Sequence, residues 1–311
     1  MRSHRITIWI ISVAILFIII ACGVVSAYVL RYQSLVDDEP DIVLSPAFSD
    51  ITYCTMDDTP LSLDLYLPTS SDHVPYPLLV YIHGGSFTRG DKRKGSGIID
   101  IPAMTERGYV VAAVNYRQMP QYPFPAALQD IKCAIRFLRA HAEQYKLRAD
   151  KIGVWGGSAG GFYAAWVGLT GHDRSFDVGE YLEQSSEVDA VVEMFGPTDL
   201  TAKMGWLQQW LMRRAFGTSS AHDPLLRQVS PVFYPADGAP PFLILHGEQD
   251  GAVPVEQARS LYQYLQDAGV NATLVIVNNA NHNFKPTGGE ISPSRDEISS
   301  LLFDFFDSQI K

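Results

Sequence analysis

The chain has 311 residues, of which 47% are hydrophobic and 19% are charged, and its formal net charge at pH 7 is −10. This composition is that of a globular protein with enough apolar residues for a large core, and it excludes a fibrous or low-complexity chain. The acidic balance argues against nucleic acid as a partner, because a phosphate backbone is bound by basic patches.

The first distinctive segment is residues 6–30, which contain no Asp, Glu, Lys, Arg, Asn or Gln. A helix of this length rises about 37 Å, so it can cross a hydrocarbon core of about 30 Å. We therefore expect residues 1–31 to form a signal-anchor that crosses a membrane once. Arg2 and Arg5 precede the apolar segment and an acidic run follows it, which favours an extracytoplasmic position for the rest of the chain.

Two other interpretations of this segment remain open. Cleavage after Ala27, at the small-residue site Val-Ser-Ala, would give a secreted protein. The residues up to Cys22 resemble a lipobox, and a lipid on Cys22 would then be the anchor. All three interpretations export the remaining chain. Residues 32–49 are polar, contain proline and are expected to be a tether.

Beyond the tether, the sequence predicts one α/β domain over residues 50–311. Residues 51–54 and 61–67 have strand character, and the turn residues 57–60 between them predict a hairpin. Continuous apolar runs then alternate with helical patterns, and these runs are residues 77–82, 109–114, 152–155, 190–194, 242–245 and 272–277. Such runs are typical of strands buried on both faces, so we expect a mainly parallel sheet with helices on both faces and the hairpin as an antiparallel edge.

The chain has three cysteines, Cys22, Cys54 and Cys133. Export would permit a disulfide between Cys54 and Cys133. Cys133, however, falls on the apolar side of a predicted helix, where a free cysteine behaves as a small hydrophobic residue. We therefore expect two buried free thiols. No spacing of Cys and His residues predicts a metal site.

Ser158 is the candidate nucleophile. It is the serine of a G-x-S-x-G motif at residues 156–160, between a predicted buried strand and a predicted helix, which is the context that this motif requires. The flanking glycines let strand and helix approach closely around a sharp turn, which exposes the serine Oγ over the sheet. The alternative is that Ser158 only caps the helix.

A serine nucleophile needs a base to take its proton. Of the eight histidines, His282 follows the last predicted strand and is best placed to reach over the sheet edge. His83 and His246 each end a strand directly before glycine, so we expect them to shape loops by hydrogen bonds. Asp250 is the expected partner of His282, and Asp199 is its rival, with a helix cap as the alternative for Asp199.

The order Ser158, Asp250, His282 is similar to that of the α/β-hydrolases. The chain from about Ile51 onward resembles their esterase/lipase branch, which includes hormone-sensitive-lipase-like esterases and bacterial feruloyl- and acetyl-esterase-like enzymes. The motifs that carry this resemblance are LDLYLP at 63–68, HGG at 83–85, NYR at 115–117, GGSAGG at 156–161 and HGEQD at 246–250. The resemblance implies an α/β-hydrolase fold with a short cap, no cofactor or metal, and an acyl-enzyme on Ser158.

The resemblance also implies an oxyanion hole made of the backbone N–H groups of Gly84, Gly85 and Ala159. Lipases of this branch have a third glycine where this chain has Ser86. We expect the Ser86 side chain to narrow the acyl site, which disfavours long acyl chains. Ser86 and the following Phe87 are therefore candidate pocket residues.

Residues 200–216 lie between two predicted strands, where hydrolases of this fold commonly insert a cap. Trp206 and Trp210 are four residues apart, and a second apolar row is formed by Met204, Leu207 and Leu211. A helix here would therefore have two apolar faces. We expect one row to pack on the domain and the tryptophans to line the substrate pocket. The alternative is that both rows are core.

The sequence as a whole predicts a serine carboxylesterase that acts on small-molecule or polysaccharide-linked esters. A first alternative is a serine peptidase of the prolyl-oligopeptidase type, but such enzymes carry a large propeller for which residues 31–50 leave no room. A second alternative is a non-catalytic binding protein with a hydrolase fold. Such proteins typically lack a triad member, whereas all three positions are filled here.

Overall fold

The computed structural model describes residues 23, 26–27, 30, 44–68, 74–220 and 222–311. Almost all of the predicted anchor segment 6–30 and most of the predicted tether lie outside the described residues. Within the described part of the chain, no helix combines the length and the apolar character needed to span a membrane. The first described strand begins at Phe48, so the last two residues of the predicted tether belong to the sheet.

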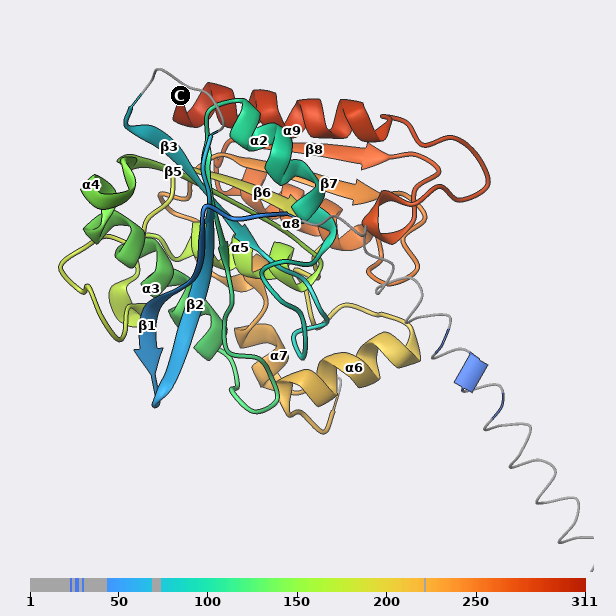
Figure 1. Cartoon of the computed structure of the whole chain (residues 1–311). Coiled ribbons are helices and arrows are strands. Elements are labelled where there is room, and N and C mark those ends of the chain that lie inside the picture. The colour runs from blue at the N-terminus through green and yellow to red at the C-terminus, as the bar shows by residue number, and fades with distance from the viewer. Residues whose placement is uncertain (1–22, 24–25, 28–29, 31–43, 69–73, 221) are drawn as a thin grey trace, which may run out of the picture.

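A single eight-stranded sheet forms the centre of the domain, in the order β1-β2-β4-β3-β5-β6-β7-β8. The strands are β1 (Phe48–Met56), β2 (Thr59–Tyr66), β3 (Tyr76–Ile82), β4 (Val110–Val114), β5 (Leu147–Gly157), β6 (Ala190–Met194), β7 (Phe242–Gly247) and β8 (Ala272–Val277). Antiparallel pairing joins β1 to β2 and β2 to β4, and the strands from β4 to β8 are parallel. The predicted parallel sheet with a hairpin at its edge is confirmed (Figure 1).

Helices cover both faces of this sheet (Figure 1). They are α2 (Ile101–Glu106), α3 (Ala126–Ala140), α4 (Ala142–Tyr145), α5 (Ala159–Leu169), α6 (Trp206–Phe216), α7 (Pro224–Gln228), α8 (Glu256–Asp267) and α9 (Arg295–Ile310), with 3₁₀ turns at Ser96–Asp100, Arg174–Phe176, Pro231–Phe233 and His282–Phe284. One core lies between the sheet and α3, α5 and α8, and a second lies under α2 and α9. Alternate side chains of β3 enter the two cores, because Val80 belongs to the first and Tyr81 to the second.

The two domain cysteines form a disulfide between Cys54 on β1 and Cys133 on α3, with Cα atoms 6.5 Å apart. The prediction of two free thiols was therefore wrong. Both residues are buried, as predicted. The helix α3 packs directly on β1, which brings two residues that are 79 positions apart in the chain within the Cα range of a disulfide.

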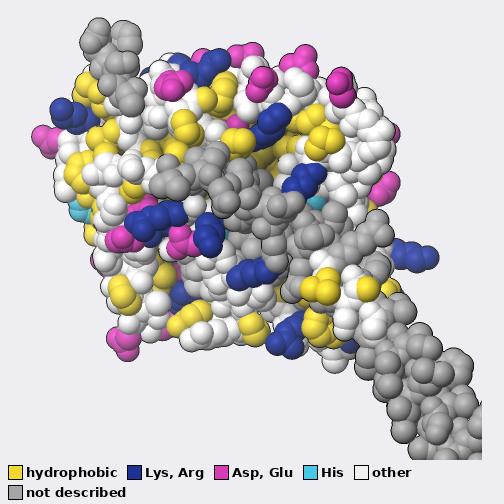
Figure 2. Space-filling view, turned by 45° about the vertical axis from the view of Figure 1, so that its right-hand side comes forward, with side chains coloured by type: hydrophobic (Ala, Val, Ile, Leu, Met, Phe, Trp, Pro, Cys, Tyr) yellow, Lys and Arg dark blue, Asp and Glu magenta, His cyan; other side chains and the backbone are white. Residues whose placement is uncertain are grey.

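The surface mixes charges of both signs. On the face in Figure 2, basic and acidic side chains are interspersed, and hydrophobic side chains form small groups between them. This face therefore differs from the continuous basic patch that binds a phosphate backbone.

Candidate active site

Ser158 lies at the turn between β5 and α5, at the edge of the sheet where the parallel strands end. Its backbone has φ 57° and ψ −122°, in a region that a non-glycine residue adopts only at an energetic cost. Its N–H donates to the carbonyl oxygen of Met194 at 2.9 Å. Although Ser158 occupies the N-cap position of α5, its side chain makes no capping hydrogen bond. The interpretation of Ser158 as a simple helix cap is therefore wrong.

Glycine at two positions lets α5 lie directly on the end of β3. A Cβ on Gly160 would lie 2.1 Å from the carbonyl oxygen of Ile82, and a Cβ on Gly156 would lie 2.5 Å from the same atom. Both distances are far shorter than van der Waals contact, so no larger residue fits without displacing the helix. This close contact fixes the position of Ser158 and explains why glycines surround it.

His282 and Asp250 form a buried pair next to this turn. The Nδ1 of His282 lies 2.7 Å from Oδ2 of Asp250, and both side chains are almost completely buried. The other carboxylate oxygen accepts the N–H groups of Ala252 and Val253, each at 2.8 Å. Burial alone would raise the pKa of Asp250, but the neighbouring rings of His282 and His246 and their hydrogen bonds hold it well below its usual value. Asp250 is therefore a carboxylate at neutral pH.

This carboxylate fixes the tautomer of His282. A carboxylate only accepts hydrogen bonds, so Nδ1 of His282 carries the hydrogen and Nε2 of the neutral ring has a free lone pair. That Nε2 atom is buried and makes no hydrogen bond with the described residues. No hydrogen bond joins Ser158 to His282 within the described chain, and such contacts often tighten only when a substrate is bound.

Phe195 contacts His282 and is the neighbour in sequence of the residue that accepts the Ser158 N–H. It directly follows Met194, whose carbonyl oxygen accepts the Ser158 N–H. Its ring packs against the ring of His282 with 4.8 Å between centroids. Phe195 itself has φ 41°, another strained backbone position. Phe195 was not predicted as a site residue, because a phenylalanine directly after an apolar run has the same sequence signal as a core residue.

Asn281 joins the loops that carry Asp250 and His282. Its side-chain oxygen accepts the N–H of Gly251 at 2.9 Å and the N–H of His282 at 2.8 Å. This residue was also not predicted, although an Asn directly before the candidate base is a usable signal, because Asn side chains commonly bond to nearby backbone groups.

Asp199 is directed to a different partner. Its Oδ1 accepts the N–H and the hydroxyl of Thr201, at 2.9 and 2.6 Å. Asp199 therefore caps a turn after β6. The alternative interpretation, that Asp199 caps a helix, was wrong, because the next helix, α6, begins only at Trp206.

The loop after β3 passes beside Ser158. A Cβ on Gly84 would lie 2.9 Å from the carbonyl oxygen of Gly157 and 3.5 Å from the Cβ of Ser158, so this loop lies against the turn of Ser158. Ala159 is the first residue of α5, where helix N–H groups have no partner within the helix. The next loop residues, Gly85 and Ser86, have φ values of 123° and 52°. Gly84 and Ala159 thus lie next to Ser158, and Gly85 and the half-buried Ser86 follow on the same loop.

His83 stabilises the loop after β3 by hydrogen bonds. Its Nδ1 lies 2.7 Å from the carbonyl oxygen of Gly84, and the hydroxyl of Tyr116 donates to the His83 carbonyl at 2.6 Å. Burial lowers the pKa of His83 to about 4, so the ring is neutral at pH 7. His246 makes a similar contact, from Nε2 to the carbonyl oxygen of Val253 at 2.9 Å. The predicted loop-shaping role of both histidines is confirmed.

The helix α6 packs one face onto the domain next to this site. Phe216 lies 5.2 Å, centroid to centroid, from the ring of Phe87, which is 1% exposed and belongs to the core. The amide of Gln208 donates to the Gly251 carbonyl at 3.0 Å, which ties α6 to the loop of Asp250. α6 therefore bridges the loop after β3 and the loop after β7.

The other face of α6 is exposed. Trp206 and Trp210 are 54% and 47% exposed, so they are not core residues and that alternative is excluded. Met204 and Leu211 of the second row pack partly buried against the domain, and Leu207 is buried. The predicted division of this segment into a packed row and an open row is confirmed.

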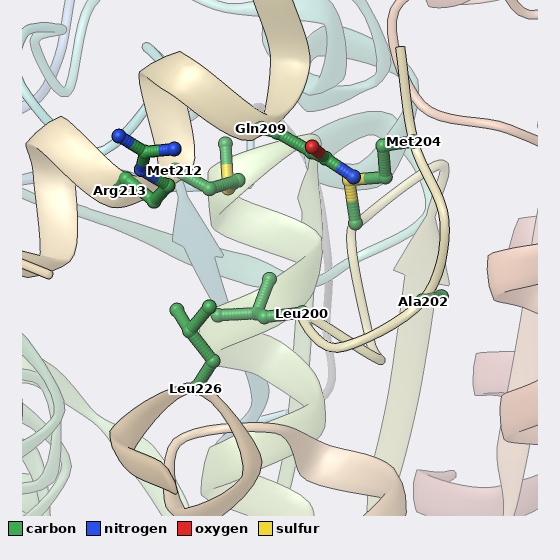
Figure 3. A pocket seen from close by; sticks show the side chains of 7 residues that line it. All are labelled: Leu200, Ala202, Met204, Gln209, Met212, Arg213 and Leu226. Carbon is green, nitrogen blue, oxygen red and sulfur yellow. The ribbon is translucent and has the colours of Figure 1, made fainter. Parts of the chain in front are cut away.

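A small crevice lies under α6 (Figure 3). Its lining residues are Leu200, Ala202, Met204, Gln209, Met212, Arg213 and Leu226. Its volume of about 10 Å³ holds no more than a water-sized group. The two methionines on its wall are flexible and can adapt to a larger group if α6 moves.

Among the described residues, no cluster of His, Cys, Asp and Glu is arranged to hold a metal ion.

Comparison with known proteins gives consistent matches. Residues 63–265 match the BD-FAE family. Esterase LipC of Mycobacterium tuberculosis is 30% identical over 68% of this chain and 53% of its own length. Among solved structures, a truncated carbohydrate esterase from gut microbiota has a TM-score of 0.74 at 26% identity, over 87% of this chain and 98% of that chain. The propionate-bound esterase 2 of Thermogutta terrifontis has a TM-score of 0.68 at 26% identity, over 85% and 94%. The chain spans about half the length of the curated relatives it matches.

Proposed function

Because the chain belongs to the BD-FAE family and has the α/β-hydrolase fold, we propose that it is a serine carboxylesterase. Ser158 is the nucleophile, His282 the base and Asp250 the acid that orients it. The observation that carries this proposal is the buried hydrogen bond of 2.7 Å between Asp250 and His282, at the same sheet edge as the strained turn of Ser158. LipC and the two structural relatives, named as esterases, support the same reaction.

In the first half of the reaction, Ser158 Oγ attacks the ester carbonyl carbon while His282 Nε2 takes its proton. The carbonyl oxygen becomes an oxyanion, which the N–H groups of Gly84, Gly85 and Ala159 stabilise. The tetrahedral intermediate collapses, the ester C–O bond breaks, and the imidazolium of His282 gives its proton to the departing alcohol. The buried carboxylate of Asp250 stabilises the imidazolium throughout.

In the second half, water hydrolyses the acyl-enzyme. His282 takes a proton from the water as its oxygen attacks the acyl carbon, and the same N–H groups bind the second oxyanion. Collapse of this intermediate breaks the bond to Ser158, which recovers its proton from His282, and the carboxylic acid leaves. The free lone pair of His282 Nε2 is the group that both halves require.

The substrates that fit best are esters with short acyl groups, either small molecules or acylated carbohydrates. The supporting observation is the half-buried Ser86, which lies on the loop beside Ser158 and whose side chain we expect to narrow the acyl site. The structural relative named as a carbohydrate esterase supports a sugar-linked ester. A panel of nitrophenyl esters of increasing chain length, together with acetylated xylan, measures this preference. Activity that rises with acyl length would contradict it.

The test of the nucleophile is Ser158→Ala, assayed with nitrophenyl acetate and with a fluorophosphonate probe. We expect both activity and labelling to disappear, because removing the nucleophile leaves only the weak catalysis of the oxyanion hole. The melting temperature should be unchanged. Ser300→Ala, at an exposed serine of α9, is the matched control and should keep both signals. Retained labelling of the Ser158 variant would identify another nucleophile.

For the whole chain, we propose a membrane anchor over residues 1–31, a tether that ends before Phe48, and an extracytoplasmic catalytic domain. The apolar segment 6–30 supports the anchor, and the Cys54–Cys133 disulfide supports export, since disulfides persist in oxidising compartments. The full-length protein should remain in membranes after alkaline carbonate extraction. Release with a new amino terminus at Tyr28 would indicate cleavage, and a lipid on Cys22 would indicate a lipoprotein.

A further inference from the structure

A second cleft, here called the Tyr122 cleft, opens between the β1–β2 hairpin and the loop after β4. Its volume is about 340 Å³, which lies within the range of roughly 300–1,000 Å³ that small-molecule sites occupy. Its walls include Thr59 and Ser62 of the hairpin and Asn115, Gln118, Gln121 and Tyr122 of the loop after β4. The proposed mechanism assigns no role to any of these residues.

The Tyr122 cleft lies at the same edge of the sheet as the nucleophile. Asn115 directly follows β4, Ser158 directly follows β5, and the parallel strand β3 separates these two strands. The last residue of β3, Ile82, is in register with the end of β4 at Val114 and with Gly156 near the end of β5. Since β2 lies one strand beyond β4, a spacing of about 4.8 Å per strand puts the cleft about 10–15 Å along the edge from β5.

The cleft and the predicted oxyanion loop share a wall. Gly90 lines the cleft, and a Cβ on Gly90 would lie 2.3 Å from the carbonyl oxygen of Gly84 and 2.3 Å from Nδ1 of His83. Tyr116 also lines the cleft, and its ring stacks on the ring of His83 with 4.3 Å between centroids. A ligand in the cleft would therefore lie next to the loop that carries Gly84.

Two glutamines of the cleft have hydrogen-bonding capacity to spare. The amide of Gln118 donates to the Gly90 carbonyl oxygen at 3.1 Å, and the amide of Gln121 donates to the Tyr122 hydroxyl at 3.2 Å. Within the described chain, the Oε1 atoms of both glutamines accept no hydrogen bond. An amide group donates and accepts hydrogen bonds, as a sugar hydroxyl does, so the two kinds of group match.

Tyr122 forms an ordered wall of the cleft. Its hydroxyl lies 3.1 Å from the hydroxyl of Thr59, and the guanidinium of Arg117 lies 5.4 Å from the centroid of its ring. The side chain is only half-buried, so part of the ring remains accessible. A phenol ring presents an apolar face and a polar tip, which suits the mixed C–H and O–H surface of a sugar. A wall that is already ordered also lowers the entropic cost of binding.

The charges beside the cleft disfavour an anionic ligand. Arg117 lines the cleft, but its guanidinium is paired with the buried carboxylate of Asp130 at 2.8 Å and with the carboxylate of Asp57. Two carboxylates thus oppose one cation, and no positive charge is left to attract a phosphate or a uronate. The lining therefore fits a neutral ligand with many hydroxyl groups.

We propose that the Tyr122 cleft binds the sugar part of an acylated neutral oligosaccharide whose ester group lies at Ser158. The proposal rests on the proposed esterase function and names the substrate class of that site. An oligosaccharide of several sugar units spans the distance along the sheet edge, whereas a small ester such as nitrophenyl acetate does not. Binding in the cleft therefore lowers KM for esters of long oligosaccharides.

The first test measures binding of sugars without catalysis. Isothermal titration calorimetry of the full-length protein with unacylated xylopentaose, cellopentaose and mannopentaose should show binding of at least one of them. We expect Gln118→Ala and Gln121→Ala each to raise its Kd about fivefold, which corresponds to the loss of one hydrogen bond. The matched control is Gln263→Ala, at an exposed glutamine of α8 that bonds to Asp267, and it should bind like the wild type.

Three results of the binding test would overturn the proposal. Absence of binding for all three oligosaccharides would reject a sugar site. A Kd that is unchanged in both cleft variants would place the sugar elsewhere on the protein. Tighter binding of an oligogalacturonate than of the neutral oligosaccharides would reject the neutral class.

The second test connects the cleft with Ser158. The oligosaccharide that binds is acetylated chemically, and its KM is compared with that of nitrophenyl acetate in the same variant. In the double variant Gln118→Ala with Gln121→Ala, the ratio of the two KM values should rise about 25-fold if the two losses add in free energy. Gln263→Ala should leave this ratio unchanged. A ratio that stays constant in the double variant would overturn the delivery of the ester to Ser158.

Failure of the proposed function gives a different result. A wild type that neither hydrolyses esters nor labels with fluorophosphonate, but still binds the oligosaccharide in the cleft, would reject the esterase and leave the sugar site. An active esterase that binds no oligosaccharide would reject the sugar site and leave the esterase.

Discussion

The helices α5 and α6 each have 11 residues and aromatic-rich sequences, but they are buried to different extents. All residues of α5 are buried, whereas α6 leaves Trp206 and Trp210 about half exposed. Every side chain of α5 packs against its neighbours, so a larger residue at any position would strain the core. Ser158 directly precedes this helix. A half-exposed helix can change its outer residues freely. The catalytic residues therefore meet at the start of the enclosed helix α5, whereas we expect α6 to be the element that varies with the substrate.

Because the catalytic residues meet at the start of α5, the largest loss of activity should come from replacing Asp250. Asp250→Asn keeps the shape of the side chain but removes the carboxylate that fixes the His282 tautomer, and we expect kcat to fall about 10⁴-fold. Asp199→Asn is the matched control, because its carboxylate bonds only to the turn at Thr201 among the described contacts. Steady-state kinetics on a nitrophenyl ester measures both variants. The reverse ranking would assign the acid to the loop after β6.

The disulfide between Cys54 and Cys133 should stabilise the layer that supports α5. Its loop spans 79 positions, and chain-entropy arguments give about 4.5 kcal/mol for a cross-link of this length. Reduction, or the double variant Cys54→Ala with Cys133→Ala, should lower the melting temperature markedly. At moderate temperature kcat should remain, because neither cysteine contacts the site residues. Denaturant unfolding with and without reductant measures the difference, and an equal midpoint in both would contradict it.

Most of the fold could be predicted from the sequence, because each buried strand is a continuous apolar run and each run alternates with a helix. The order of the strands in the sheet was not available from this pattern. The candidate nucleophile, base and acid were predictable because each follows directly after a strand, and parallel strands end at the same edge.

The contacts that join these residues could not be predicted. Cys54 and Cys133 meet only because α3 packs on β1, and nothing local to either cysteine signals this. Thr59 and Tyr122 likewise meet only because β2 pairs with β4, which brings the hairpin beside the loop after β4. Register between distant strands depends on the packed sheet as a whole, so local patterns do not specify it.

A pair of glycine substitutions tests the difference between α5 and α6 directly. In Gly160→Ala the new Cβ meets the Ile82 carbonyl oxygen at 2.1 Å, and backbone cannot move aside cheaply. We expect a loss of about 3 kcal/mol in stability, or failure to fold. In Gly205→Ala, at the start of α6, the Cβ meets only the flexible end of Gln208, at 2.2 Å, and the loss should be small. Equal losses, measured by denaturant unfolding, would remove the distinction between the two helices.

The smallest expected effects come from the open face of α6. Trp206→Ala and Trp210→Ala remove large apolar side chains from the exposed face of α6. This helix is joined to the Asp250 loop by the hydrogen bond of Gln208. If these rings contact the substrate, KM for bulky aryl or longer-chain esters should rise about fivefold, while KM for acetate esters stays the same. The melting temperature should change little, because both side chains are about half exposed.

The control for this pair is Leu301→Ala on α9, an exposed apolar residue on the opposite face of the sheet, which should leave every KM unchanged. The informative quantity is the ratio of KM values for bulky and small esters within one variant, because KM does not depend on how much of the protein is folded. A constant ratio with a large drop in melting temperature would mean that the tryptophans stabilise the fold. In that case α6 would be as constrained as α5, and the substrate would have to be selected elsewhere, by the loop at Ser86.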